Sequence, residues 1–192
     1  ALSLLAGERA DKSIIRQEAA VFGSPKAYHF LMTNFCNAQC IFCNQSSGGS
    51  GKKEITLERF KAMVSHIPVD TARTFVLSGG GDPLLCRDLF SIIEFINTSF
   101  PWIDVHLRTN GLLLRQYADE LARSGITHLE MSVHGGIETN DAIVQRNKTE
   151  EIFKGISLLN ERLTRYKKKI YKAFYPCVSA VNINEMPGLI RK

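Results

Sequence analysis

The sequence predicts an α/β fold in the form of a partial (β/α) barrel, and three observations indicate it. Short β-rich runs and amphipathic helical runs alternate five times, which is typical of right-handed βαβ units in a parallel sheet. Two of the β-rich runs alternate polar and apolar residues, as strands do when helices cover only one face of a sheet. The chain has 192 residues, of which 44% are hydrophobic, and it holds no apolar run long enough to cross a membrane. We therefore expect one globular domain with a substantial core and no membrane partner.

The predicted elements follow one another from the N-terminus. Residues 1–22 are expected to form a helix that ends at Gly23 and Pro25. A β-rich run at 27–34 comes next, and Thr56 is a typical N-cap for the helix behind it. Further strands are expected at 74–78, 103–109, 127–134 and 173–181. The helices between them are indicated by apolar residues at helical spacing: Leu85, Leu89, Ile92, Ile93 and Ile96, then Leu114, Tyr117 and Leu121, then Ile152, Ile156 and Leu159.

We expect two parts in this chain, an N-terminal helix at 1–22 and a core domain at 23–192. No linker or low-complexity tract divides the core domain. Its fifth strand is followed only by a predicted helix start at Asn184–Pro187, so five βα units are visible. The core domain is therefore expected to be incomplete at its C-terminus.

The positive charge of the chain comes from one segment. The net charge is +5, and residues 161–172 (ERLTRYKKKIYK) hold six basic residues against one acidic residue. Of the 24 basic and 19 acidic residues in the chain, 18 of each kind lie outside this segment. We interpret the segment as a solvated helix end, where cations meet the negative pole of the helix dipole. A nucleic-acid surface is the less favoured alternative.

Three of the five cysteines, Cys36, Cys40 and Cys43, stand close together in a CxxxCxxC pattern. This spacing lets one loop wrap a single metal centre, and thiolates bind soft metals. A structural zinc ion takes four ligands, and no Cys or His lies between Cys43 and His66 to complete such a set. A [4Fe–4S] cluster held by three cysteines instead leaves one iron open for a substrate or cofactor. Crowded thiols in a chain without a signal peptide also indicate a reducing cytoplasm.

The cysteine pattern, with Phe42 before the third cysteine, resembles that of the radical S-adenosylmethionine (SAM) superfamily. Three further segments fall in matching order and resemble the GGE, TNG and SxDG-type motifs of that family: Ser78-Gly79-Gly80-Gly81-Asp82-Pro83, Thr109-Asn110-Gly111 and Met131-Ser132-Val133-His134-Gly135. The resemblance covers roughly residues 28–186. It implies a barrel of radical SAM type in which the three cysteines hold the cluster. The residues that it assigns to SAM are Phe42, Gly79, Gly80, Gly81, Asp82, Asn110, Ser132 and Arg146.

This chain departs from the family pattern in two places. Asp82 stands where the family typically has Glu, which is one methylene longer. The family core usually has a sixth βα unit, which is not visible here.

The resemblance also implies an enzyme. A reduced cluster donates one electron to SAM in this family, and cleavage gives methionine and a 5′-deoxyadenosyl radical that abstracts hydrogen from a substrate. The substrate is unidentified, a peptide or a small metabolite, and an electron donor such as a flavodoxin or ferredoxin is an expected partner. A nucleic acid is not an expected partner. The alternative from another class is a non-catalytic zinc-binding or nucleic-acid-binding module that uses the three cysteines and the basic helix end.

The alternation in the third and fourth strands predicts which residues face the substrate. Side chains two residues apart in a strand share a face. The polar faces carry the substrate-cavity candidates His106, Arg108, Glu130 and His134, together with Asn110 and Ser132. Helices should cover the apolar face, so the polar set is expected to line a cavity filled with water or substrate. Val105 and Met131 point the opposite way and are expected in the core.

Overall fold

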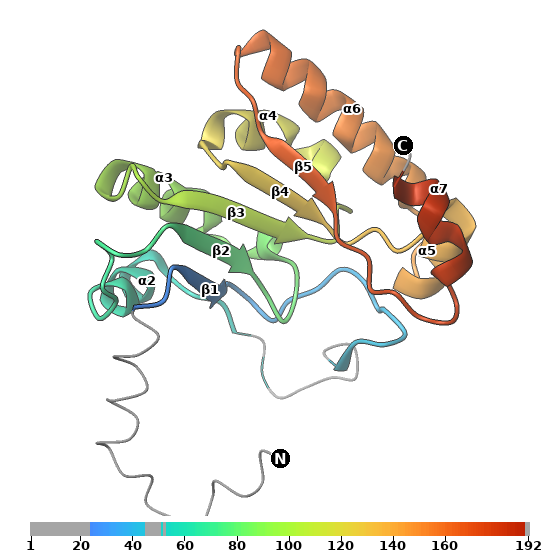
Figure 1. The fold of residues 1–192 in the computed structure, drawn as a ribbon, viewed down its shortest axis with the longest axis horizontal. Helices are drawn as coiled ribbons and strands as arrows, with labels where there is room; N and C mark the ends of the chain where they lie inside the picture. The colour runs from blue at the N-terminus through green and yellow to red at the C-terminus, as the bar shows by residue number, and fades with distance from the viewer. Residues whose placement is uncertain (1–23, 45–50, 52, 191–192) are drawn as a thin grey trace, which may run out of the picture.

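The computed structural model describes residues 24–44, 51 and 53–190. The predicted helix at 1–22 and most of the predicted loop at 46–53 lie outside these residues. A parallel sheet of five strands forms the centre of the described chain, in the order β1-β2-β3-β4-β5 (Figure 1). The strands are β1 (Ala27–Leu31), β2 (Thr74–Ser78), β3 (Asp104–Thr109), β4 (His128–Met131) and β5 (Tyr171–Phe174).

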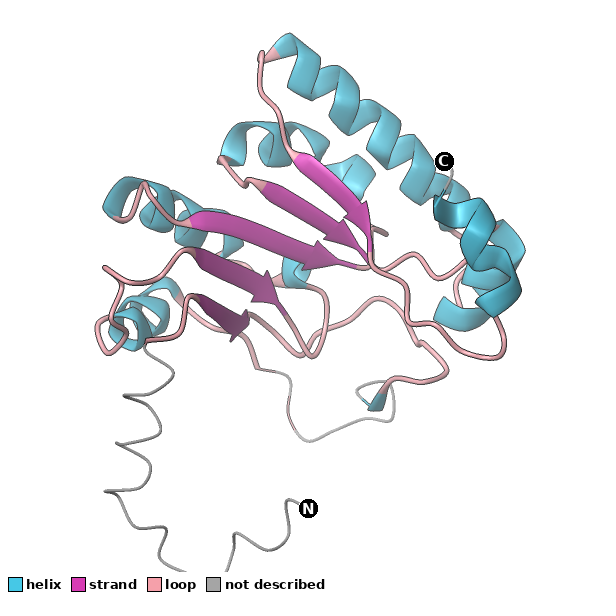
Figure 2. Cartoon of the chain, in the orientation of Figure 1, coloured by secondary structure: helices cyan, strands magenta, loops and turns pink. Residues whose placement is uncertain are grey.

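Helices cover one face of this sheet (Figure 2). Because consecutive strands are neighbours and parallel crossovers are right-handed, the connecting helices fall on the same side. These helices are α2 (Leu57–Val64), α3 (Leu89–Ser99), α4 (Leu114–Ser124) and α6 (Thr149–Arg165). The shorter α5 (Ile137–Val144) and α7 (Met186–Ile190) lie beyond the C-terminal ends of the strands, and two 3₁₀ turns, η3 (Pro83–Leu85) and η4 (Ile183–Glu185), complete the fold. The predicted α/β partial barrel is confirmed. In the described part of the chain, no helix is both long and apolar enough to span a bilayer.

The two faces of the sheet differ as the sequence predicts. Val105 and Leu107 of β3 and Met131 of β4 are buried in the core against the helices. Arg108 and Glu130, each next to one of these residues, are half-buried on the opposite face. The register of β3 and β4 pairs Arg108 with Glu130 directly. The predicted alternation is therefore confirmed, and we call the polar side the inner face.

Local signals set the ends of several helices. The hydroxyl of Thr56 accepts a hydrogen bond from the backbone N–H of Arg59 and caps α2, as predicted. α4 ends at Gly125, which takes a left-handed conformation with φ 81°. A Cβ at Gly125 would lie 2.6 Å from Nδ2 of Asn97, which itself donates to the carbonyl of Ser124. Any larger residue would therefore strain the turn and disturb the contact between α3 and α4.

The fifth strand is displaced from its predicted position. It spans Tyr171–Phe174, whereas the apolar run predicts 173–181. The N–H of Tyr175 still donates to the carbonyl of Met131, but Pro176 follows and has no N–H to offer to a ladder. The chain therefore leaves the sheet at this proline, and residues 177–181 pass over its C-terminal edge instead.

β1 and β4 are also shorter than predicted, because the chain bends away after each of them. They end at Leu31 and Met131 rather than at positions 34 and 134. Thr33 forms an isolated antiparallel bridge with Glu54, and the N–H of Val133 turns back to the carbonyl of Met131. Polar and apolar residues keep alternating through the bend after β4, so periodicity does not mark its end.

Two helical features differ from the prediction. Leu85 belongs to the turn η3 rather than to α3, because Asp82 caps that turn and Cys86 behind it is extended. α5 has no predicted counterpart. Its buried apolar residues, Ile143 and Val144, are adjacent and come from a single turn, so they give no helical periodicity, and its N-cap residue makes no side-chain capping bond.

The basic segment 161–172 forms the end of α6 and the turn into β5. Arg162 pairs with Asp119 of α4, and Nζ of Lys168 donates to the carbonyl of Arg123. Because the segment precedes β5, it lies at the N-terminal edge of the sheet, whereas the cysteines follow β1 at the C-terminal edge (Figure 1). The basic helix end and the cysteines therefore do not share one surface.

We predict that Met131→Ala lowers the free energy of unfolding by about 2–5 kcal/mol, because it leaves a cavity in the core. Met63→Ala is the matched control, since Met63 on α2 is 47% exposed and Met131 is 2% exposed. We expect the control to change stability by less than about 0.5 kcal/mol. Urea denaturation followed by circular dichroism measures both variants. Equal losses would contradict the register of β4.

Candidate functional site

The three cysteines lie on residues 32–44, which follow β1 at the C-terminal edge of the sheet and which we call the cysteine loop. Cys36 is exposed, and Cys40 and Cys43 are partly exposed. The Sγ of Cys36 accepts hydrogen bonds from the N–H of Ala38 at 3.4 Å and from Nδ2 of Asn110 at 3.7 Å. All three thiols can therefore be reached from outside the fold.

The thiols influence one another electrostatically. Burial and, after it, the neighbouring Cys36 and Cys43 raise the pKa of Cys40 to about 11. Burial also raises the pKa of Cys36. The sulfur atoms would thus repel one another as thiolates, and a bound cation would relieve that repulsion. Among residues 24–44, 51 and 53–190, no three His, Cys, Asp or Glu side chains are arranged to hold a metal ion.

The glycine run after β2 packs directly on the backbone of the cysteine loop. The N–H of Gly81 donates to the carbonyl of Thr33 at 2.9 Å. A Cβ at Gly81 would lie 1.8 Å from the carbonyl oxygen of Phe35, and one at Gly79 would lie 2.7 Å from that of Thr33. A side chain at either glycine would therefore push the loop away from the sheet. Gly80, between them, is half-buried.

Asp82 joins the end of β2 to the end of β3. Its Oδ2 accepts hydrogen bonds from Oγ1 of Thr109 and from the N–H of Asn110, both at 2.7 Å. Its Oδ1 accepts from the N–H of Leu84 at 3.0 Å. The side chain is fully enclosed, and burial raises the pKa of Asp82 while these hydrogen bonds oppose the shift. Both carboxylate oxygens are thus used inside the protein.

Asn110 connects β3 to the cysteine loop. Its Nδ2 donates to Oδ1 of Asn37 at 2.8 Å, and its Oδ1 accepts from the N–H of Leu112 at 2.9 Å. On the other side, the N–H of Ser132 donates to the carbonyl of Thr109, which continues the pairing of β3 and β4. Asn110 and Ser132 therefore lie at the ends of neighbouring strands.

Phe42 and His134 form a pair at the far end of the cysteine loop. Their rings are 5.1 Å apart in an edge-to-face arrangement. Nδ1 of His134 accepts a hydrogen bond from the N–H of Cys177 at 3.0 Å, and burial lowers the pKa of His134. Because Nδ1 accepts this hydrogen bond, the neutral imidazole carries its proton on Nε2. Phe42 itself is 47% exposed, so one side of its ring stays accessible.

An ion-paired cluster occupies the inner face. Glu130 binds Arg108 through Oε2, at 2.8 Å to Nε and 2.7 Å to Nη2, and contacts Nδ1 of His106 at 3.3 Å through Oε1. His106 stacks on His128 with ring centroids 3.9 Å apart, and the guanidinium of Arg108 lies 4.1 Å from the ring centroid of Tyr175. These side chains form a polar, partly accessible wall.

Arg146 lies just after α5 and reaches back to the cysteine loop. Its Nε donates to the carbonyl of Asn37 at 2.8 Å, and its Nη1 donates to Oε1 of Gln39 at 3.1 Å. The segment that follows β4 thus contacts the same loop as the segments that follow β2 and β3.

The sequence profile of the radical SAM superfamily matches residues 30–192. The chain belongs to the radical SAM superfamily. A probable GTP 3′,8-cyclase of Methanopyrus kandleri is 29% identical over 174 residues, which cover 87% of this chain and 52% of that protein. A second one, of Methanocella arvoryzae, is 33% identical over 102 residues, which cover 53% of this chain and 32% of that protein. The chain therefore spans about half or less of the length of these relatives.

Solved structures share this radical SAM fold. Hexahistidine-tagged anSMEcpe with bound AdoMet gives a TM-score of 0.65 at 19% identity and covers 87% of this chain and 47% of its own. BtrN in complex with AdoMet and 2-DOIA gives a TM-score of 0.56 at 18% identity and covers 78% of this chain and 56% of its own. At these identities the likeness concerns the fold alone.

The radical SAM fold brings most of the predicted residues together, but not all. Of the predicted cavity residues, Glu130 contacts both His106 and Arg108 on the inner face. His134 does not join them, because the bend after β4 turns it inward and the N–H of Cys177 covers it. The four predicted residues therefore do not form one group. His106, Arg108 and Glu130 belong to the polar wall, whereas His134 is buried and packs against Phe42.

Several residues that support α5 and the segment after β4 escape sequence reasoning. Asn140, Asp141, Asn182 and Glu185 each hold two or more backbone or hydroxyl groups near the site. Each is a common polar residue in a short segment, and its partners lie up to 49 positions away. The fully buried Asn140 and Asn182 have no motif that signals their burial.

We predict that Gly81→Ala displaces the cysteine loop, because its Cβ would overlap the carbonyl of Phe35. Stability should fall by about 2 kcal/mol or more, and the half-buried Cys40 should be alkylated faster. Gly188→Ala is the matched control, since a Cβ there meets nothing within 4 Å. Urea denaturation and mass-spectrometric alkylation rates measure both effects. Wild-type alkylation in the Gly81 variant would show that the loop does not depend on this contact.

Proposed function

We propose that this chain is the core of a radical SAM enzyme. In this proposal Cys36, Cys40 and Cys43 hold a [4Fe–4S] cluster, and SAM is cleaved beside it so that hydrogen is abstracted from a substrate. One observation carries the proposal: the segments that follow β2, β3 and β4 all bind the loop that carries the three cysteines. Parallel α/β folds bind their ligands at this carboxyl edge of the sheet.

The chemistry of the donor set fits such a cluster. Three thiols on one loop can each bind a different iron, which leaves the fourth iron without a protein ligand. The sulfur of Cys36 accepts hydrogen bonds from N–H groups of Ala38 and Asn110. Hydrogen bonds to cysteine sulfurs tune the reduction potential of a cluster. When bound, a cluster of this type supplies the electron for the reductive cleavage of SAM. AdoMet bound to the structural neighbours anSMEcpe and BtrN supports the assignment.

In this proposal, residues of this chain bind SAM and set its orientation. Gly80 offers a backbone without a side chain, which suits carbonyl contacts to an ammonium group. The accessible side of Phe42 suits the adenine ring. Asn110 and Ser132 stand at strand ends beside the cysteine loop, and Asp82 acts indirectly by holding the N–H of Asn110.

The inner face is the proposed substrate side, because its charged groups are partly accessible and adjoin Asn110 and Ser132. The relatives named above are GTP 3′,8-cyclases, so GTP is the first substrate to test. A peptide or another small metabolite is the wider class, since the fold is shared with BtrN in complex with 2-DOIA and with anSMEcpe bound to a peptide. A flavodoxin or ferredoxin is the proposed electron donor.

The function is tested by Cys40→Ala in protein reconstituted anaerobically with iron and sulfide. We expect the wild type to bind iron and acid-labile sulfide and, after reduction, to form 5′-deoxyadenosine from SAM. Cys40→Ala should lose both properties, because the cluster loses one of three ligands. Cys177→Ala is the matched control, an exposed cysteine outside the loop. Wild-type protein that binds zinc but no sulfide would favour the metal-binding module instead.

We predict that Glu130→Gln lowers the yield of product per SAM cleaved by about tenfold or more, because Arg108 and His106 lose their shared ionised partner. Asp104→Asn, an exposed carboxylate on the same face of β3, is the control and should match the wild type. Chromatography of 5′-deoxyadenosine and product gives the ratio. An unchanged ratio in the Glu130 variant would remove this residue from the substrate side.

The same variant has a second readout in its pH dependence. Burial raises the pKa of Glu130, but the hydrogen bond and charge of Arg108, followed by those of His106, lower it overall. A carboxylate with a lowered pKa stabilises the fold above its ordinary pKa of about 4.3, and this stability is lost as the pH falls through the lowered value. The difference in unfolding free energy between wild type and Glu130→Gln should therefore be largest near neutral pH and shrink as the pH falls below the ordinary pKa of about 4.3.

A further inference from the structure

The short helix α5 is held firmly at its N-terminus. Glu185 of η4 accepts a hydrogen bond from the N–H of Gly136 at 2.6 Å through Oε2, and one from the hydroxyl of Thr139 through Oε1. These bonds keep the pKa of Glu185 below its ordinary value. A carboxylate at this end also meets the positive pole of the helix dipole. The segment after β5 therefore anchors the start of α5.

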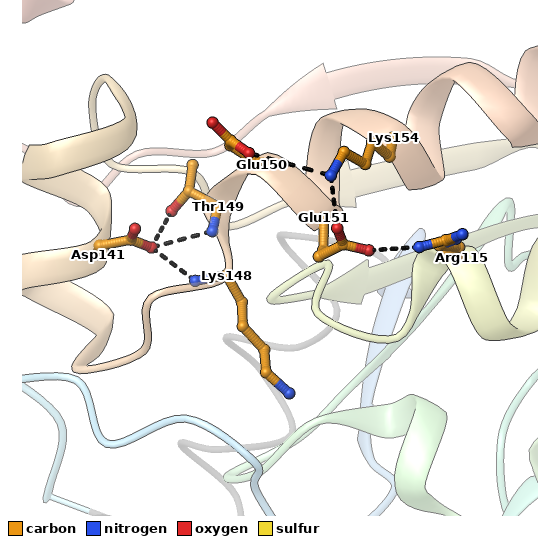
Figure 3. Close-up of polar contacts among 7 residues, drawn as sticks. All are labelled: Arg115, Asp141, Lys148, Thr149, Glu150, Glu151 and Lys154. Atoms are coloured by element: carbon orange, nitrogen blue, oxygen red, sulfur yellow. Dashed lines mark hydrogen bonds and ion pairs between the residues drawn. The ribbon is translucent and has the colours of Figure 1, made fainter.

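The middle of α5 is tied to the start of α6 (Figure 3). Oδ1 of Asp141 accepts hydrogen bonds from the N–H groups of Lys148 and Thr149, at 3.0 and 2.9 Å, and from the hydroxyl of Thr149. The buried Asn140 donates to the same hydroxyl at 2.8 Å. α5 is thus fastened to the helical layer that covers the sheet.

The C-terminal end of α5 binds the cysteine loop. The carbonyls of Val144 and Ile143 accept hydrogen bonds from the N–H groups of Gln39 and Ile41, at 3.1 and 3.0 Å. The last carbonyls of a helix have no partner within it, so they are available for such bonds. The two amides flank Cys40 on either side. The backbone around the central cysteine is therefore held by the end of a helix that is itself anchored at two other places.

Arg146 extends this contact. Gln145 takes a left-handed conformation with φ 54°, which turns the chain after α5 back toward the cysteine loop. The guanidinium of Arg146 then spans the carbonyl of Asn37 and the side chain of Gln39, and Nη1 also donates to the carbonyl of Gln145. The planar guanidinium of an arginine presents several N–H donors in a fixed arrangement, so it suits two acceptors at fixed positions. The ammonium group of a lysine does not.

We propose that Arg146, together with the end of α5, is a positioning device that sets the backbone of the cysteine loop on both sides of Cys40. The resemblance to the family assigns Arg146 to SAM, but its contacts assign it to this loop. The role for the cluster rests on the proposed function. The role for the loop does not, because the contacts that define it join Arg146 to the backbone of Asn37 and the side chain of Gln39.

The first test is hydrogen exchange of the protein without iron, read at the amides of Gln39 and Ile41. We expect both amides to be protected in the wild type and to exchange about tenfold faster or more in Arg146→Gln, because the loop loses two charge-assisted hydrogen bonds. Arg146→Lys should not restore protection. Arg115→Gln, which removes a surface ion pair, is the matched control and should exchange like the wild type. Unchanged protection in Arg146→Gln would overturn the proposal.

The second test separates the two roles of Arg146 in reconstituted protein without SAM. We expect iron to be lost to a chelator faster in Arg146→Gln and Arg146→Lys than in the wild type and in Arg115→Gln. Normal iron retention with weaker SAM binding, measured by equilibrium dialysis, would assign Arg146 to SAM instead and overturn the proposal. If the wild type binds no cluster, the proposed function fails, while the exchange test still decides the role of Arg146 in the loop.

Should Arg146→Gln not fold, Gln39→Ala serves in its place, because it removes the exposed acceptor of Nη1 and leaves Arg146 intact. We expect faster exchange at Ile41 in this variant as well. Wild-type exchange there would contradict the inference.

Discussion

The cysteine loop has little regular structure of its own, so its backbone polar groups depend on partners from other segments. On one side the carbonyls of Thr33 and Phe35 accept from the N–H groups of Gly81 and Asp82. On the other side its amides donate to the end of α5. The glycine run lies so close to the carbonyl of Phe35 that no Cβ fits at Gly81. This dependence explains why the glycine run, the end of β3 and the segment after β4 all converge on one loop.

A second constraint comes from a sheet that helices cover on one face only. The covered side is a continuous apolar core that includes Met131. The inner side must tolerate partial burial of charge, and it does so by pairing Glu130 with Arg108 and His106. An unpaired carboxylate at this depth would carry a desolvation cost, whereas the paired one keeps a lowered pKa. The inner face can therefore hold ionised groups beside the site without a loss of stability.

Asp82 illustrates how a departure from a family pattern acquires a physical meaning. The side chain is one methylene shorter than the Glu of the family motif, and its oxygens end within reach of Thr109, Asn110 and Leu84. They hold the loop after β3 instead of facing outward. Because a shared fold does not by itself fix function, such local contacts are where this chain can differ from other proteins of the same fold.

The sequence alone predicts the features whose signals lie close together in the chain. These are the polar and apolar faces of β3, the cap at Thr56, the turn at Gly125 and the cysteine pattern. The ends of β4 and β5, the existence of α5 and the burial of His134 do not follow from it. Only the tertiary structure decides that Arg146 binds Asn37 and Gln39, which stand 109 and 107 positions earlier. Such a contact leaves no local pattern, because it exists only where parallel crossovers bring the carboxyl ends of distant strands to one edge.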